Sequence, residues 1–168
     1  MIKNLLFVAF LALLPATTSR CFAQELLDGI PGTKEEFIAS EKKVFATIDW
    51  LETTPFGTEE DKRTRQNALL IAWLTNSPTV TIEINADILT FTKKHSELLM
   101  TFMGGWTRYC LQNNYSKDAI QGSLAGIRSV IKVYKNQSLK KDKEVEKLIE
   151  LESKGELENW VREKMAKR

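Results

Sequence analysis

The segment Phe102-Met103-Gly104-Gly105-Trp106-Thr107-Arg108-Tyr109 places two adjacent glycines inside a run that otherwise favours a helix. A glycine in a helix interior costs about 1 kcal/mol relative to alanine, so two of them indicate a close backbone approach, a kink or room for a ligand. A second segment, 119–129, repeats small residues at helical spacing: Ala119, Gly122, Ser123, Gly126 and Ser129. We therefore predict that both segments are helices and that they pack closely against each other at these small residues.

The first segment also supports a second interpretation, in which the glycines make room for a ligand groove. Aromatic rings combined with a few polar groups are typical of binding pockets. The residues predicted to bind a partner are Trp106, Arg108, Tyr109 and Asn113, with Asn114 and Gln121 beside them. The sequence leaves close packing and a groove open as alternatives.

Apolar residues recur every three or four positions through most of the remaining chain, which predicts further helices. The predicted spans are 34–53, 58–76, 96–112 and 117–136, a short helical stretch at 86–92, and a lysine- and glutamate-rich pair over 140–167 that divides at Gly155. Thr33 and Glu36 have the spacing of a capping box, and Ser116 is predicted to cap the helix that follows it. The predicted fold class is all-α, a single-domain bundle of five or six helices.

Segment 79–84 differs from the helices because Val80, Ile82 and Ile84 alternate with polar residues, a pattern typical of a strand. No partner strand is evident elsewhere in the sequence. We therefore predict a short extended connector packed on helices. The alternative is a dimer in which two copies of this segment pair edge to edge.

The N-terminus has the features of a signal peptide. Lys3 precedes an unbroken run of ten apolar residues at 5–14, which is too short to span a bilayer but has the length of a signal-peptide core. Small residues at Cys21 and Ala23 predict cleavage before Gln24. Lipid attachment at Cys21 is disfavoured because Arg20 stands where the lipoprotein peptidase requires a small residue. The predicted organisation is a signal peptide at 1–23, a lead-in loop at 24–33 and one helical domain at 34–168.

Cleavage would change the charge and cysteine counts. The chain has 24 basic and 22 acidic residues, and the predicted leader contains two of the basic residues and no acid. The 145 residues that remain would be balanced at 22 against 22, which gives no case for a nucleic-acid or anionic-membrane surface. Cys110 would be the single cysteine, and we expect it to be buried. The predicted product is periplasmic or secreted, with no membrane span after cleavage.

The sequence offers few groups for catalysis or metal binding. His95 and Cys110 on one continuous helix would lie about 22 Å apart, too far for a nucleophile and its base, and His95 is expected to be a helix cap or solvated. The run Glu59-Glu60-Asp61 is explained by a helix N-terminus. The carboxylates that could form a hydrolytic pair are Asp49, Glu52, Asp87, Glu97 and Asp118, and no spacing selects two of them. We predict no metal and no cofactor.

Three blocks, at 72–76, 102–109 and 121–127, resemble a group of small exported all-helical bacterial proteins to which no activity is assigned. The resemblance implies export and supplies no site. The predicted function is therefore non-enzymatic binding of a protein or small-molecule partner, for example inhibition of a secreted toxin by an immunity-type protein. The alternative is a cell-wall or glycan hydrolase, or a small-ligand carrier, that uses carboxylates in a helical cleft.

Overall fold

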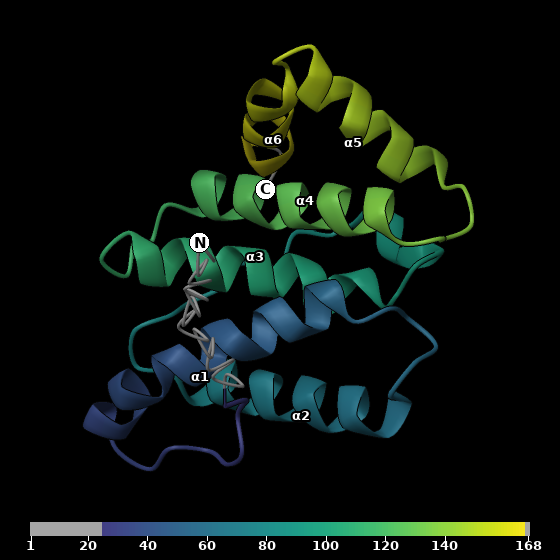
Figure 1. Cartoon of the computed structure of the whole chain (residues 1–168). Helices are drawn as coiled ribbons and strands as arrows, with labels where there is room; N and C mark the ends of the chain where they lie inside the picture. Colours follow the sequence, from purple (N-terminus) through teal and green to yellow (C-terminus); the bar gives the residue numbers. More distant parts are fainter. Residues whose placement is uncertain (1–24, 167–168) are drawn as a thin grey trace, which may run out of the picture.

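The computed structural model describes residues 25–166, and within them it contains helices and no strands. The elements are α1 (Lys34–Thr53), α2 (Glu60–Asn76), the 3-10 helix η1 (Thr90–Lys93), α3 (Leu98–Gln112), α4 (Ala119–Asn136), α5 (Lys143–Ser153) and α6 (Leu157–Ala166) (Figure 1). The six α-helices pack as one bundle, which confirms the predicted fold class. The predicted signal peptide lies outside the described residues.

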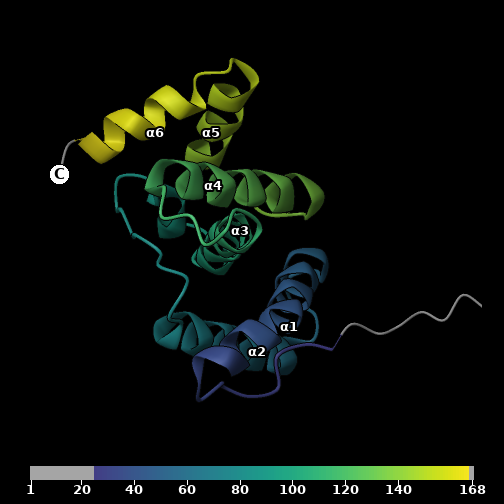
Figure 2. The same ribbon diagram turned by 90° about the vertical axis from the view of Figure 1, so that its left-hand side faces the viewer.

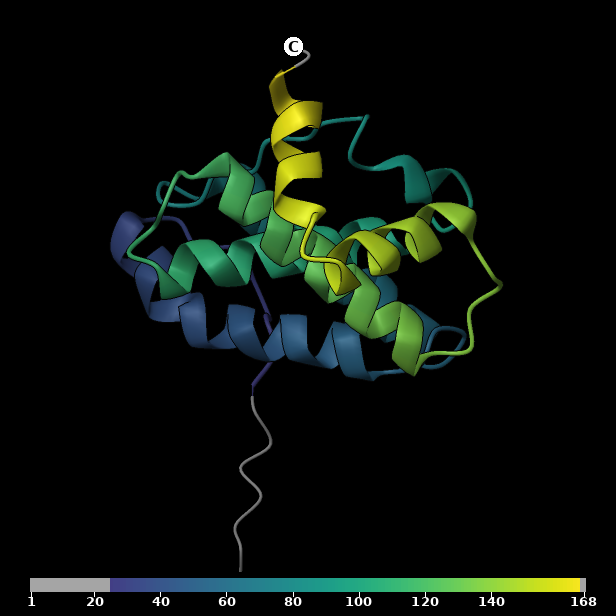
Figure 3. The same cartoon turned by 90° about the horizontal axis from the view of Figure 1, so that it is seen from above.

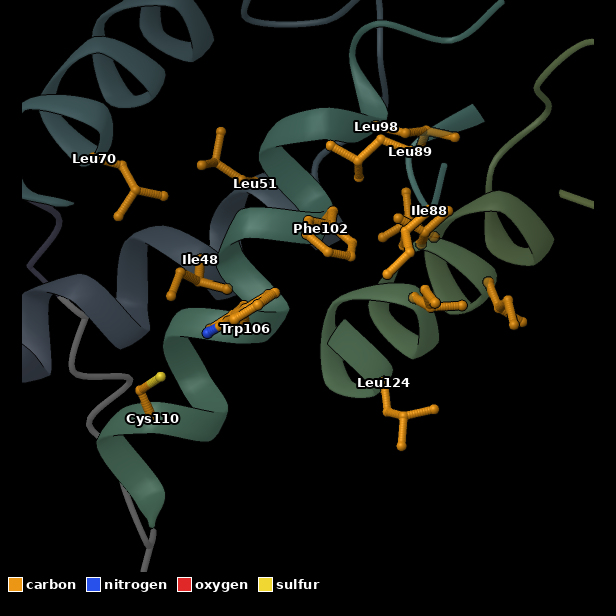
Figure 4. Packing of buried hydrophobic residues seen from close by; sticks show 14 of the residues in the cluster. Ile48, Leu51, Leu70, Ile88, Leu89, Leu98, Phe102, Trp106, Cys110 and Leu124 are labelled. Atoms are coloured by element: carbon orange, nitrogen blue, oxygen red, sulfur yellow. The ribbon is translucent and has the colours of Figure 1, made fainter. Parts of the chain in front are cut away.

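The helices are stacked, with α3 and α4 packed against each other in the middle (Figures 1 and 2). Helices α1 and α2 cover one side of this central pair, and α5 and α6 cover the other. Viewed from above, α6 crosses α4 steeply (Figure 3). The core runs from Leu70 of α2 through Ile48 of α1 and Phe102 of α3 to Leu124 of α4 (Figure 4). It continues to Leu148 of α5 and Leu157 of α6. No helix in residues 25–166 has both the length and the apolar character needed to cross a bilayer.

The glycines account for the close approach of α3 to its neighbours. A methyl group on Gly105 would lie 2.5 Å from Ser129 Oγ and 2.7 Å from the Ala125 carbonyl of α4. A methyl group on Gly126 would lie 2.6 Å from the Phe102 ring. The predicted packing of the two small-residue segments is therefore confirmed for Gly105. Gly104 instead faces α1, since its added methyl group would meet Ile48 Cγ2 at 3.0 Å.

The start of α1 and the break between α5 and α6 agree with the sequence prediction, whereas the N-cap of α4 does not. Thr33 and Glu36 form the predicted capping box of α1, whose bounds are those predicted. The N-cap of α4 is Asp118, whose carboxylate accepts from two backbone N–H groups, and not Ser116 as predicted. An aspartate two residues further on can reach the orphan N–H groups directly. Gly155, with φ +71°, divides α5 from α6 as predicted.

The connection between α2 and α3 contains less helix than predicted. Segment 79–84 forms no strand and packs on the helices through the buried Val80, as expected for a connector. The predicted helical stretch at 86–92 is wrong in its bounds, because only Thr90–Lys93 forms a single 3-10 turn. Asn85 organises the preceding turn by accepting backbone N–H groups from Ile88 and Leu89.

The lead-in segment is fixed to the bundle by Leu27. Its side chain is 2% exposed, and its backbone N–H donates to Thr47 Oγ1 at 2.9 Å. The Leu27 carbonyl accepts from the Gln66 amide at 3.1 Å. These bonds attach the segment to α1 and α2 at once. Among the described residues, Leu27 is therefore the first with a buried side chain, and it is the fourth residue after the predicted cleavage position.

Candidate functional site

The predicted binding residues do not share one exposed face. Trp106 is 2% exposed, because its ring lies against Gly122 of α4 and edge-on to Phe102 at 5.9 Å between centroids (Figure 4). It belongs to the core, so its predicted role in lining an open groove is corrected. Asn113 is exposed and is the C-cap residue of α3. Its side-chain amide donates to the Tyr109 carbonyl of the last turn. The glycine next to Trp106 serves packing against α4 and does not open a cavity.

Arg108, the third of these predicted residues, lies in a charged network that joins three helices. Its guanidinium contacts Asp49 Oδ1 at 2.7 Å and Glu52 Oε1 at 3.3 Å, both on α1. Lys132 of α4 contacts Glu52 Oε2 at 3.0 Å. Glu52 therefore lies between two cations, with a side chain that is 2% exposed. Of the five carboxylates named from the sequence, the fold brings these two together.

Glu52 and Lys132 of this network line a cleft between the C-terminal ends of α1 and α4, which lie on the same side of the molecule (Figures 1 and 3). The cleft has a volume of about 450 Å³, within the usual range for a small-ligand site. It is lined by Glu52, Thr53, Pro55, Phe56, Lys132, Asn136, Gln137, Ser138 and Leu139. The lining residues therefore come from two segments that are about 80 positions apart in the sequence.

Side-chain bonds to the end of α1 hold the cleft in shape. Gln137 donates its amide to the Glu52 and Thr54 carbonyls and accepts from the Phe56 backbone N–H at 2.9 Å. Arg63 of α2 donates to the Leu51 and Thr54 carbonyls from the opposite side. Burial lowers the pKa of the Arg63 guanidinium, which has no acid within ion-pair distance among the described residues. The two side chains together satisfy the carbonyls that a helix C-terminus leaves without partners.

The exposed charged side chain among the residues that line the cleft is Lys132. Lys132 is 58% exposed at the side chain, whereas Glu52 is covered by it. Asn136 and Ser138 are exposed beside Lys132. Pro55, Phe56 and Leu139 supply an apolar wall. This arrangement fits an acceptor-rich or anionic group attached to an apolar part.

The other residues that the sequence suggested for catalysis or metal binding either have structural roles or lie apart from the cleft. Asp118 caps α4, and Asp87 is exposed. His95 is 5% exposed and does not cap α3, so the expectation that it is a helix cap or solvated is wrong. Its ring bonds to Glu97 Oε1 at 2.9 Å and to the Lys140 carbonyl at 2.8 Å. Cys110 is buried, as predicted. No group of three or more His, Cys, Asp or Glu side chains within residues 25–166 is arranged to hold a metal ion.

Sequence reasoning missed Lys132, Gln137 and Phe56, because the cleft depends on two helix ends meeting across the bundle. Glu52 was a candidate only by residue type. No family model, curated protein sequence or solved structure matches the chain. The geometry of the cleft is therefore the basis for a functional proposal.

Proposed function

We propose that this chain is an exported, non-enzymatic binding protein whose partner occupies the cleft between the ends of α1 and α4. The observation that supports this proposal is the accessible Lys132 ammonium, set beside an apolar wall and anchored by the buried Glu52. The partner would present an anionic group next to an apolar group. A small amphipathic acid or an acidic side chain of a protein would both supply this chemistry.

The ion pairs favour binding over hydrolysis. A glycosidase requires one carboxyl group that can donate a proton and a second that acts as base or nucleophile. Asp49 and Glu52, the two carboxylates that converge here, both contact Arg108, and Glu52 also contacts Lys132. Both carboxylates are thus occupied by ion pairs within the protein, and only Glu52 of the two lines the cleft, so they do not face each other across one substrate position.

The test is a titration of isotope-labelled protein with octanoate, followed by amide chemical shifts. We expect shifts at residues 52–56 and 132–139, little response to octylammonium, and octanoate recovered unchanged. Lys132→Met is expected to weaken binding on the order of tenfold, because a hydrogen bond to a charged group is lost. Lys135→Met, also an exposed lysine of α4, is the matched control and should bind as the parent does.

A second variant distinguishes a loss of octanoate binding from a loss of folding. Ser138 is exposed at the cleft, so Ser138→Trp should fill the cavity, leave the helical signal intact and abolish the octanoate shifts. Shifts that survive this substitution, or equal binding of octylammonium, would contradict the proposed site. Conversion of a bound substrate would contradict the non-enzymatic proposal.

Export is the second part of the proposal. It is supported by the predicted leader and by the position of Leu27, whose contacts lie just beyond the predicted cut and would survive it. N-terminal sequencing of protein recovered from the host's periplasm or medium is expected to begin at Gln24. Protein that stays in the cytoplasm with its original N-terminus would contradict export.

A further inference from the structure

One face of α1 has an apolar centre that the core does not absorb. Ile38 is 43% exposed, and Phe45, which is half-buried, does not belong to the core cluster. The two residues are seven positions apart, so their side chains lie on the same side of the helix. Helix α1 runs along one edge of the bundle when the molecule is viewed from above (Figure 3). This face of α1 is therefore accessible to a partner.

A hollow beside Phe45 has room for a side chain of that partner. It has a volume of about 530 Å³ and is lined by Glu25, Ala39, Lys42, Lys43, Phe45 and Ala46. The lead-in segment forms one side of it, because Lys43 contacts Glu25 at 3.5 Å and Asp28 at 3.0 Å. An apolar side chain from a facing helix fits such a hollow as a knob fits a hole.

The charges on this face of α1 have both signs. The ionisable side chains on it are Lys34, Glu35, Glu41, Lys42 and Asp49. Asp49 contacts Arg108 of α3 and keeps a side chain that is 46% exposed, and the other four have no ion pair among residues 25–166. Glu41 lies beside the neutral Tyr115 hydroxyl, whose pKa it raises, and stays charged. The three acids are balanced by the two lysines and Arg108, so the face has no excess of either charge.

A second copy of the same face has the matching pattern. In an antiparallel pair of α1 helices related by a two-fold axis, each contact occurs twice. In one register, every facing pair joins either two apolar side chains or two opposite charges. The facing pairs are Ile38 with Phe45, Glu41 with Lys42, and Lys34 with Asp49. This face of α1 is thus complementary to itself.

Other symmetric arrangements of the two faces set like charges against each other. An antiparallel pair with Ile38 opposite its own copy sets Lys34 against Lys42 of the second chain. It also sets Glu35 against Glu41. In a parallel pair each residue faces its own copy, so lysine meets lysine and glutamate meets glutamate. Like charges that face each other across an interface disfavour association.

The remaining apolar register is disfavoured for the same reason. An antiparallel pair with Phe45 opposite its own copy sets Glu41 against Asp49 of the second chain. The apolar residues and the charges therefore select one arrangement. We propose that two copies of this chain associate through α1 in antiparallel orientation, with Ile38 of each copy seated in the hollow beside Phe45 of the other.

The first test is sedimentation equilibrium from micromolar to millimolar concentration. We expect a monomer–dimer equilibrium with a dissociation constant within that range, because one helix face buries less area than a standard interface. Ile38→Ala should raise the dissociation constant about tenfold or more, since each dimer loses two isoleucine contacts. Ile71→Ala is the matched control: Ile71 on α2 is 45% exposed, and its variant should associate as the parent does.

Charge reversal tests the register. Glu41→Lys alone, or Lys42→Glu alone, sets like charges opposite each other and should prevent association. The double variant restores opposite charges and should form dimers again. Equal amounts of the two single variants should also associate when mixed, which shows that both are folded. Lys143→Glu, at an exposed position in the first turn of α5, changes the net charge as Lys42→Glu does and should leave the dimer intact.

Three outcomes would overturn the proposal: a chain that stays monomeric up to millimolar concentration, equal weakening by Ile38→Ala and Ile71→Ala, or charge variants that fail to associate when mixed. All proteins in these tests share one N-terminus, so any contribution from that end cancels. The inference does not depend on the cleft, because none of the substituted residues lines it. Octanoate shifts at residues 52–56 and 132–139 should be the same in Ile38→Ala as in the parent, so the two proposals fail separately.

Discussion

Cys110 lies in the last turn of α3 with 1% of its surface exposed. Burial raises the pKa of its thiol, because the thiolate loses its solvation, and the thiolate is the reactive form. We expect iodoacetamide to alkylate Cys110 much more slowly in the folded protein than in urea. Mass spectrometry over time measures both rates. Equal rates would show that the thiol is accessible in the folded protein and would contradict its burial.

His95 connects the segment before α3 to the loop after α4. Its two ring nitrogens lie within hydrogen-bond distance of Glu97 Oε1 and of the Lys140 carbonyl. His95→Leu removes both bonds and should lower the free energy of unfolding by about 1–3 kcal/mol, the usual cost of leaving a buried polar group without a partner. Urea denaturation measures the loss, with Ser96→Ala at the exposed neighbouring position as control. A change no larger than the control's would contradict this role.

At the scale of elements, the α3–α4 contact depends on glycine at position 126. An alanine there gains about 1 kcal/mol of helix propensity, but its methyl group would lie 2.6 Å from the Phe102 ring and 2.8 Å from the Phe102 carbonyl. Since overpacking typically costs about 1–3 kcal/mol or more, we expect Gly126→Ala to destabilise the protein overall. Thermal and urea unfolding measure this. Gly29→Ala, where an added methyl group meets nothing within 4 Å, should have little effect.

The elements themselves could be predicted because their signals are local. The capping box at Thr33 and Glu36 defines the start of α1, and the glycine at 155 divides α5 from α6. Close packing at Gly105 followed from the cost of glycine in a helix. The burial of the Trp106 side chain could not be predicted from the sequence, because a tryptophan next to glycines is compatible with both a ligand groove and a packed core. Only the register of α3 against α4 places its ring over Gly122.

At the scale of the whole molecule, the bundle should unfold as one unit. Its core is a single cluster that includes residues of all six α-helices. The tryptophans sample four of them: Trp50 in α1, Trp73 in α2, Trp106 in α3 and Trp160 in α6. We expect tryptophan fluorescence and far-ultraviolet circular dichroism to give coincident urea transitions, the behaviour of a two-state domain. A separate early transition assigned to α5 and α6 would contradict this expectation.

The candidate site could not be predicted from the sequence, because it depends on contacts between residues that are far apart in the chain. Lys132 reaches Glu52, and Lys94 reaches the carbonyl of Lys141, across 80 and 47 positions of the chain. Charge totals and local spacing contain no information about such pairs. They arise when the ends of several helices meet on one side of the bundle. The sequence therefore predicts the helices well and the surfaces between their ends poorly.

The glycine contact between α3 and α4 also bears on how the chain folds. The two helices are joined by only six residues, 113–118, so bringing them together closes a short loop at little entropic cost. The pair lies at the centre of the bundle, and the outer helices pack on its two outer faces, α1 against α3 and the C-terminal pair against α4 (Figure 2). Contacts that are local in sequence form early and speed folding. The hairpin of α3 and α4 is thus suited to act as the folding nucleus, onto which α1 and α2 dock from one side and the C-terminal pair from the other.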